Sequence, residues 1–232
     1  MTRLKLFLAA LAVLLPLPAF ADITGHYLFD GKVEFTVEVA SDGKSRIDVP
    51  GKLAIIGRDG TDYLIMESED GPKVFLLRDM IGAALPKEAR QYPEAIAFGI
   101  AAGKPVTVAG QQGAGWLLKL VKGPDADRKK QIEFALSADP GLAPIGDVFR
   151  RTVAPMLDAS VSLFPVSSGF GARVADLLAK GTPLRVMPID TAAARSETPV
   201  VEFKSLDTAP IGAARFELPA PVTPVSDLAG AG

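Results

Sequence analysis

The chain has 232 residues, 48% of them hydrophobic, and a formal net charge of −2. This mildly acidic balance argues against nucleic acid and anionic membrane surfaces as partners, because both attract clustered positive charge. The sequence contains no cysteine and a single histidine. Thiolate metal sites, multi-histidine metal sites and a Cys–His nucleophile pair are therefore excluded.

Residues 1–21 have the pattern of a secretory signal peptide. Arg3 and Lys5 precede an apolar run from Leu6 to Leu17, and the segment ends on Ala19–Ala21. We expect cleavage after Ala21, and no lipid anchor, because no cysteine stands at the cleavage point. The pattern predicts a soluble protein of the bacterial periplasm, without a membrane span in the mature chain.

The first half of the mature chain predicts antiparallel strands joined by tight turns. Apolar and polar residues alternate with a period of two in residues 34–39 and 44–49. Further predicted strands are Ile23–Phe29, Leu53–Ile56, Tyr63–Glu67 and Lys73–Leu77. Between the strands lie four Asp-Gly pairs, at residues 30–31, 42–43, 59–60 and 70–71. Asp-Gly is typical of type I′ hairpin turns, in which both central residues have positive φ.

The second half predicts helices interleaved with more strands. We expect helices over Met80–Ala89 and Pro93–Ile100, a helix capped by Asp139 and extending through Met156, and a helix from Phe170 to Leu178. Predicted strands are Val106–Ala109, Gly115–Leu120, Gln131–Ser137, Pro183–Pro188 and Val200–Leu206. Hairpins dominate this order, so the fold class is α+β, with an antiparallel sheet covered by a few helices. Residues 22–220 form one domain, and residues 221–232 read as a disordered tail.

The segments that resemble catalytic motifs have simpler explanations. His26 belongs to the polar face of the first strand, and no G-x-S-x-G elbow supplies a serine partner for it. The S-x-x-K pattern from Ser41 to Lys44 falls in a predicted turn. The glycines at 169 and 171 lack the third glycine of a dinucleotide fingerprint. The basic run Arg128–Lys130 reads as a solvated hairpin tip, with a docking patch as the alternative. We expect no cofactor.

The predicted helices carry broad apolar faces. If a curved sheet leaves space beneath them, these side chains would line a hydrophobic cavity. The cavity candidates are Ile81, Leu85, Ile96, Phe98, Val148, Phe149 and Met156. Ordinary core packing predicts the same pattern, so both interpretations remain open.

Several short segments of the chain resemble the superfamily of periplasmic lipoprotein carriers and its bacterial relatives. They are Asp22–Tyr27, Lys44–Val49, Gly103–Gly110, Gly181–Arg185 and Pro210–Pro219. The resemblance implies a strongly curved, unclosed antiparallel β-barrel with helices as a lid and a cavity that receives acyl chains. It also implies an arginine inside the barrel that helps to lock the lid. Arg46, Arg58 and Arg78 lie in the corresponding half of this chain.

Taken together, these patterns predict a noncatalytic periplasmic protein that binds a hydrophobic ligand, such as a lipid or acyl chain, between sheet and helices. The first alternative is an envelope protein-binding or sensor module with a packed core. A hydrolase using carboxylates or serine is the second alternative, and two carboxylates in a deep polar cleft would favour it.

Overall fold

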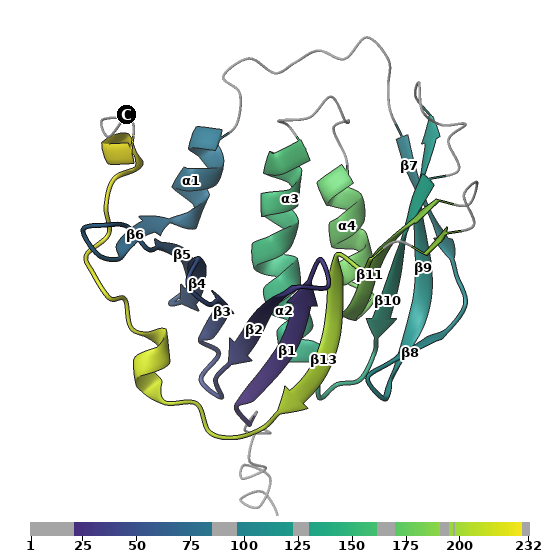
Figure 1. Ribbon diagram of the computed structural model, residues 1–232, viewed down its shortest axis with the longest axis horizontal. Coiled ribbons are helices and arrows are strands. Elements are labelled where there is room, and N and C mark those ends of the chain that lie inside the picture. The colour runs from purple at the N-terminus through teal and green to yellow at the C-terminus, as the bar shows by residue number, and fades with distance from the viewer. Residues whose placement is uncertain are drawn as a thin grey trace, which may run out of the picture.

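The computed structural model describes residues 21–84, 97–122, 130–161, 170–190, 195–196 and 198–228. Leader residues 1–20, the basic residues 128 and 129 and the cavity candidates Leu85 and Ile96 lie outside this part of the chain. One antiparallel sheet curves strongly without closing into a barrel, and helices lie on its inner face (Figure 1). The predicted α+β class and the unclosed, helix-covered sheet are confirmed.

The first wing of the sheet is the predicted meander. Its strands are β1 (Ile23–Phe29), β2 (Val33–Val39), β3 (Ser45–Val49), β4 (Leu53–Arg58), β5 (Thr61–Met66) and β6 (Lys73–Leu76). Two of the four Asp-Gly turns have positive φ at both residues, those at Asp30 and Asp59. At Asp42 and Asp70 only the following glycine has positive φ, so the type I′ prediction is wrong there. The Asp42 carboxylate instead accepts the backbone N–H of Lys44.

The second wing contains β7 (Ala97–Ala102), β8 (Val106–Val108), β9 (Gln111–Lys122), β10 (Lys130–Ser137), β11 (Thr182–Asp190), β12 (Arg195–Ser196) and β13 (Val201–Asp207). The order across the sheet is β6-β5-β4-β3-β2-β1-β13-β11-β10-β9-β7. The predicted helix over Pro93–Ile100 is wrong for residues 97–100, which belong to β7. There Phe98 pairs with Leu120 and Ile100 pairs with Leu118, so both apolar side chains of β7 face the core with a period of two.

The helices are α1 (Leu77–Ala84), α2 (Ala143–Val148), α3 (Ala154–Val161) and α4 (Phe170–Leu178). A π-helical turn, η1 (Phe149–Val153), joins α2 to α3 without a break. The predicted cap at Asp139 is wrong, because the N-cap is Leu142, with Pro144 in the first turn. The Asp139 carboxylate accepts the N–H of Gly141 in the preceding turn. No helix in the described ranges is long and apolar enough to cross a membrane.

The main core fills the space between the two wings and the helices. Alternate strand residues such as Val37, Ile47 and Leu118 point inward, and Ile145, Val148 and Leu177 meet them from the helices. All six of these side chains are buried. At about 25 cal/mol per Å² of buried apolar surface, such a core is the main source of stability in a chain without disulfides.

A C-terminal strap, residues 208–228, crosses the outer face of the first wing (Figure 1, yellow). It contains two 3₁₀ turns, η2 (Ala213–Phe216) and η3 (Val225–Leu228). Leu218 and Ala220 pack on a second apolar cluster of Ala54, Ile56, Ile65 and Val74. Beyond residue 220, where the sequence predicts a disordered tail, Val222 bridges to Val74, and the Thr223 N–H bonds to the Val74 carbonyl at 2.7 Å.

Candidate functional site

The described cavity candidates do not share one environment. Val148 and Phe149 are 3% and 5% exposed, in the main core. Ile81, Phe98 and Met156 are half-buried and pack against the edge of that core. Side chains therefore fill the interior around Val148 and Phe149, a place where the sequence was compatible with either a cavity or a packed core.

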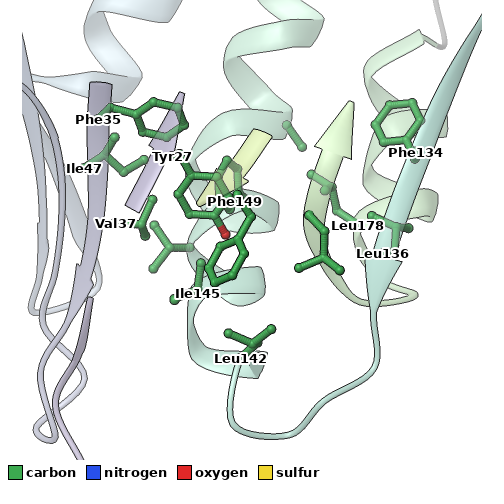
Figure 2. Close-up of a cluster of buried hydrophobic side chains, with 14 of the residues drawn as sticks. Tyr27, Phe35, Val37, Ile47, Phe134, Leu136, Leu142, Ile145, Phe149 and Leu178 are labelled. Atoms are coloured by element: carbon green, nitrogen blue, oxygen red, sulfur yellow. The ribbon is translucent and has the colours of Figure 1, made fainter. Parts of the chain in front are cut away.

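Aromatic rings account for much of this filling. Tyr27 stacks on Phe35, with ring centroids 5.1 Å apart, and meets Phe149 and Phe203 edge-on at 5.3 and 5.4 Å. Gly25 leaves room for the Tyr27 ring, because a Cβ there would lie 2.9 Å from that ring and from Ile145. Figure 2 shows the Tyr27 hydroxyl among these apolar side chains. The hydroxyl has no hydrogen-bond partner in the described part of the chain, and burial raises the pKa of Tyr27.

Half-buried apolar side chains gather instead toward one end of the helical layer. The C-terminal ends of α1 and α3 and the starts of α4 and β7 lie at the same upper end (Figure 1). Phe98 and Phe170 meet there edge-on, 5.3 Å apart. We give the name apolar rim to six of the half-buried apolar residues of these four elements: Met80, Ile81, Phe98, Met156, Leu157 and Phe170.

A polar bridge ties the helical layer to the inner face of the first wing. The Arg151 guanidinium on η1 donates to the Ser45 hydroxyl at 2.7 Å, and its Nε lies 3.5 Å from Asp62 Oδ1. The Thr152 hydroxyl donates to Asp62 Oδ2 at 3.0 Å. Both carboxylate oxygens of Asp62, whose side chain is 16% exposed, are therefore engaged. We call these four residues the lid bridge.

Gly57 makes space for the lid bridge. It lies between Ser45 and Asp62 in the strand register, on the same inward-facing row. A Cβ at this position would lie 2.5 Å from the Ser45 hydroxyl and 2.7 Å from Arg151 Nη2 and Asp62 Oδ1. Such distances are shorter than real Cβ contacts allow, so the guanidinium occupies the volume that another residue's side chain would need.

The resemblance implies a lid-locking arginine but aligns no arginine of this chain with it; Arg46, Arg58 and Arg78 only lie in the corresponding half. In the structure, the arginine that connects helices and sheet is Arg151. Arg46 and Arg58 lie on the outer face and donate to the strap carbonyls of Arg215 and Phe216. Arg78, on α1, has a side chain that is 78% exposed. The sequence gives no distinct signal for Arg151, which is flanked by Arg150 and Thr152, and only tertiary structure pairs it with Asp62.

Beside the lid bridge, a cleft of about 210 Å³ opens between α1, the β4–β5 turn and the η1–α3 helix. We call it the lid cleft, and its lining residues are Gly60, Thr61, Asp62, Leu77, Arg78, Ile81, Arg151, Thr152 and Pro155. Of the described cavity candidates, Ile81 alone lines it. The lid cleft combines two arginine side chains, a carboxylate that is paired with Arg151, and apolar side chains. This combination suits recognition of a small charged group rather than acid–base chemistry.

On the outer face, charged side chains hold the strap. Arg215 donates to both oxygens of Glu38, at 2.6 and 3.1 Å, and to Asp48 at 2.7 Å. Burial opposes the ionised form of Asp48, but hydrogen bonds from Arg215 and Arg46 outweigh it and hold the pKa of that carboxyl below its ordinary value. Near the start of the strap, the Asp22 carboxylate accepts hydrogen bonds from the backbone N–H groups of Ile211 and Ser41, which lowers the pKa of Asp22.

The other motif residues have structural roles. His26 is half-buried on β1, opposite Thr36 and Ser205, on the face away from Tyr27. The residues from Ser41 to Lys44 form the predicted turn, closed by Gly43 N–H bonding to the Ala40 carbonyl. Among the described residues, no group of three or more His, Cys, Asp or Glu side chains could hold a metal ion.

No protein-family model matches the chain, and no curated protein sequence matches it. Its structure is similar to that of MucB, at 14% identity and a TM-score of 0.39, over 87% of this chain and 58% of that chain. It is also similar to a chain of the Pseudomonas aeruginosa MucA/MucB complex, at 11% identity and a TM-score of 0.41, over 86% and 56% of the two chains. A structure of MucB with MucA(peri) matches at 13% identity and a TM-score of 0.32, over 82% and 51%. The chain thus spans little more than half the length of these structures.

Proposed function

We propose that this protein is a noncatalytic binding protein of the bacterial periplasm whose ligand is a partner protein of the envelope. The partner docks at the end of the helical layer where the apolar rim meets the lid cleft. The leader pattern of residues 1–21 supports the compartment. The resemblance of the sequence to the periplasmic lipoprotein-carrier superfamily supports a role in binding rather than catalysis.

The observation that carries the proposal is the packing of Phe149 and Val148. An acyl chain bound between sheet and helices needs an enclosed apolar volume of several hundred Å³. At this place, instead, Phe149 meets Tyr27 and Phe35 with ring centroids 5.3 and 6.5 Å apart. The remaining half-exposed apolar side chains lie at the surface, where a protein partner can cover them.

A hydrophobic ligand is the second candidate, and the composition of the apolar rim favours it. Met80, Met156 and Leu157 are flexible, uncharged side chains that pack against the core without being buried. Methionine-rich surfaces adapt to ligands of varied shape. A lipid tail could occupy the rim without entering the packed interior.

The polar side chains of the lid cleft also support a noncatalytic role. Asp62 is the carboxylate in the lid cleft, and Arg151 and Thr152 occupy its two oxygens. A hydrolase that uses a pair of carboxylates would need two of them in one cleft, and Asp62 is the one carboxylate among the described residues that line the lid cleft.

Native mass spectrometry of the protein released gently from periplasm, with and without chemical crosslinking, tests the proposal. We expect a crosslinked complex of fixed stoichiometry with one envelope protein, and no lipid in the solvent extract. A lipid in fixed stoichiometry with no protein partner would replace the first candidate with the second.

Variants at the rim identify the surface. We expect Met156→Glu to weaken capture of the partner about tenfold or more, because it places a charge in the centre of the apolar rim. Ala172→Glu is the matched control, since Ala172 is exposed on α4 and does not belong to the rim. Equal capture by both variants, with both folded, would contradict the rim as the docking surface.

A further inference from the structure

The lid cleft has the size of a site for one side chain. Its volume of about 210 Å³ lies below the 300 to 1,000 Å³ typical of pockets for small-molecule ligands. One wall is apolar, made by Leu77 and Ile81 of α1 and by Pro155 of α3. The polar residues that line the cleft include Thr61, Asp62 and Thr152.

The charges around the cleft favour an anion. Arg151 is held by Ser45 and Asp62 through Nη2 and Nε, and its side chain is 46% exposed, so the rest of the guanidinium faces the cleft. Arg78 reaches the same mouth from α1, where its Nε lies 3.5 Å from Oδ1 of the adjacent Asp79. Such an exposed pair between neighbours stabilises weakly.

The carboxylates near the cleft are already engaged. Asp62 is bound by Arg151 and Thr152. Asp59, in the adjoining turn, is 3.3 Å from Arg58, which also pairs with Glu217. Within the described residues, the contacts of Arg78 and Arg151 use only some of the five N–H donors of each guanidinium. The remaining donors can bind an incoming carboxylate, which the planar guanidinium group can hold through two parallel hydrogen bonds.

We propose that the lid cleft binds the carboxylate side chain of a glutamate of the partner protein. The glutamate stem packs on Leu77, Ile81 and Pro155, and its carboxylate lies between Arg78 and Arg151. This inference rests on the proposed function, because it assigns the anchoring chemistry of the same docking surface. A glutamate stem is long enough to touch the apolar wall while its head reaches the arginines, which distinguishes it from a bare anion such as phosphate.

Titration of the whole protein with short peptides, followed by amide NMR shifts, tests the inference. The probes are the blocked peptide Ac-Gly-Leu-Glu-Gly-amide, the same peptide with glutamine in place of glutamate, inorganic phosphate, and micelles of a short-chain phosphatidylglycerol. We expect saturable shifts at Thr61, Leu77 and Thr152 with the glutamate peptide, at millimolar affinity, and a response at least about tenfold weaker with the glutamine peptide.

Arg78→Glu is the test variant and Arg150→Glu the matched control. Arg150 belongs to the η1 turn, is 53% exposed, pairs with Asp147 and does not line the cleft. We expect Arg78→Glu to weaken the glutamate peptide about tenfold and Arg150→Glu to leave it within about twofold. Arg151 is left intact in both variants, because it also holds the lid.

Each other outcome overturns the inference. Equal shifts with glutamate and glutamine peptides would show that charge is not recognised. Saturation by phosphate or by phosphatidylglycerol micelles but not by the peptide would assign the cleft to a different anion. If the envelope partner is captured equally by wild type and Arg78→Glu, the glutamate anchor fails while the proposed function stands. If no partner is captured by either, the proposed function fails independently.

Discussion

Gly57 shows how a residue without a side chain makes room for a polar contact on the inner face of the sheet. The inward-facing row across β3, β4 and β5 reads Ser45, Gly57 and Asp62. Only the central position lacks a Cβ, and the Arg151 guanidinium lies above it. The absence of a Cβ at Gly57 thus lets the half-exposed Arg151 guanidinium reach Ser45 and Asp62 together, which a side chain at position 57 would prevent.

We expect Gly57→Ala to destabilise the protein by about 1–3 kcal/mol, the usual cost of inserting atoms into a filled site. The added Cβ would displace Arg151 from Ser45 and Asp62. Urea unfolding measures the change in free energy of unfolding. Gly82→Ala is the control, since an alanine Cβ at this position of α1 would meet no atom within 4 Å, and alanine should stabilise that helix by up to about 1 kcal/mol. If both substitutions changed the free energy of unfolding by the same amount, the space at Gly57 would not be needed to accommodate Arg151.

Tyr27 gives a second prediction at the scale of one residue. Its ring fills the centre of the aromatic cluster, but its hydroxyl is buried without a hydrogen-bond partner in the described structure. A buried, unsatisfied hydroxyl costs about 1–3 kcal/mol. We expect Tyr27→Phe to keep the packing and to raise the free energy of unfolding by about 1 kcal/mol, measured by thermal and urea denaturation. A clear loss of stability would mean that the hydroxyl has a bound water or another partner.

Among the elements, those with strong local patterns were predictable. The period-two strands of the first wing and the apolar stripe of α4 match the structure because one face of each element is buried, so that hydrophobic periodicity reports the element type. Residues 97–100 were not predictable in this way, because Ala, Phe, Gly and Ile fit a short helix or a strand equally well. These residues form a strand because they pair with β9, a tertiary contact that the local sequence does not show.

The candidate site was less predictable than the fold. Sequence patterns gave Ile81, Phe98 and Met156 as candidates for a cavity wall or for the core, with no reason to separate them from the core residues Val148 and Phe149. The lid bridge joins Ser45, Asp62 and Arg151, which are up to 106 positions apart in the chain. No spacing rule connects such residues, and the π-helical turn that orients Arg151 has no local sequence signature.

Carboxylates supply part of the attachment of the strap, beside the apolar packing of Leu218 and Ala220, so the attachment should depend on pH. The pKa values of Asp48 and Asp22 are lowered from 3.8 in the folded state. A carboxyl with a lowered pKa contributes stability above its unfolded pKa, and loses it as the pH falls through the folded pKa. We expect the hydrogen-bonded strap amides of Ile211, Arg215, Glu217 and Thr223 to be protected from hydrogen exchange at neutral pH and to lose protection below about pH 4.

Arg215→Gln provides the matched test of this ionic attachment. The variant removes the cation that contacts Glu38 and Asp48. In this variant, the strap amides should exchange hydrogen faster already at neutral pH, and their exchange rates should change less on acidification. Amides of β10 and β11 serve as internal controls, since they lie far along the sheet order from the strap. An acid-dependent loss of protection that is the same in both proteins would assign the effect to groups other than this network.

At the scale of the whole molecule, both wings and all the described helices share one hydrophobic core. Tyr27, Phe203, Leu118 and Ile145 come from β1, β13, β9 and α2, yet they belong to the same buried cluster. The wings join through the pairs β1–β13 and β13–β11, so neither wing can separate without opening that core. The small outer cluster under the strap is the exception, because Leu218 and Ala220 of the strap cover it from outside.

This arrangement predicts a single cooperative unfolding transition for both wings. Trp116, the one tryptophan of the chain, lies in β9 of the second wing, with the Lys180 ammonium 4.4 Å above its ring. Its fluorescence in urea should therefore change together with the far-UV circular dichroism of the whole sheet, because shared burial couples the wings. Deleting residues 210–232 should lower the midpoint of both signals while leaving them coincident, since the strap covers only the outer cluster. Two separate transitions in the intact protein would mean that the wings fold as independent units, and that binding at the lid could proceed by their separation.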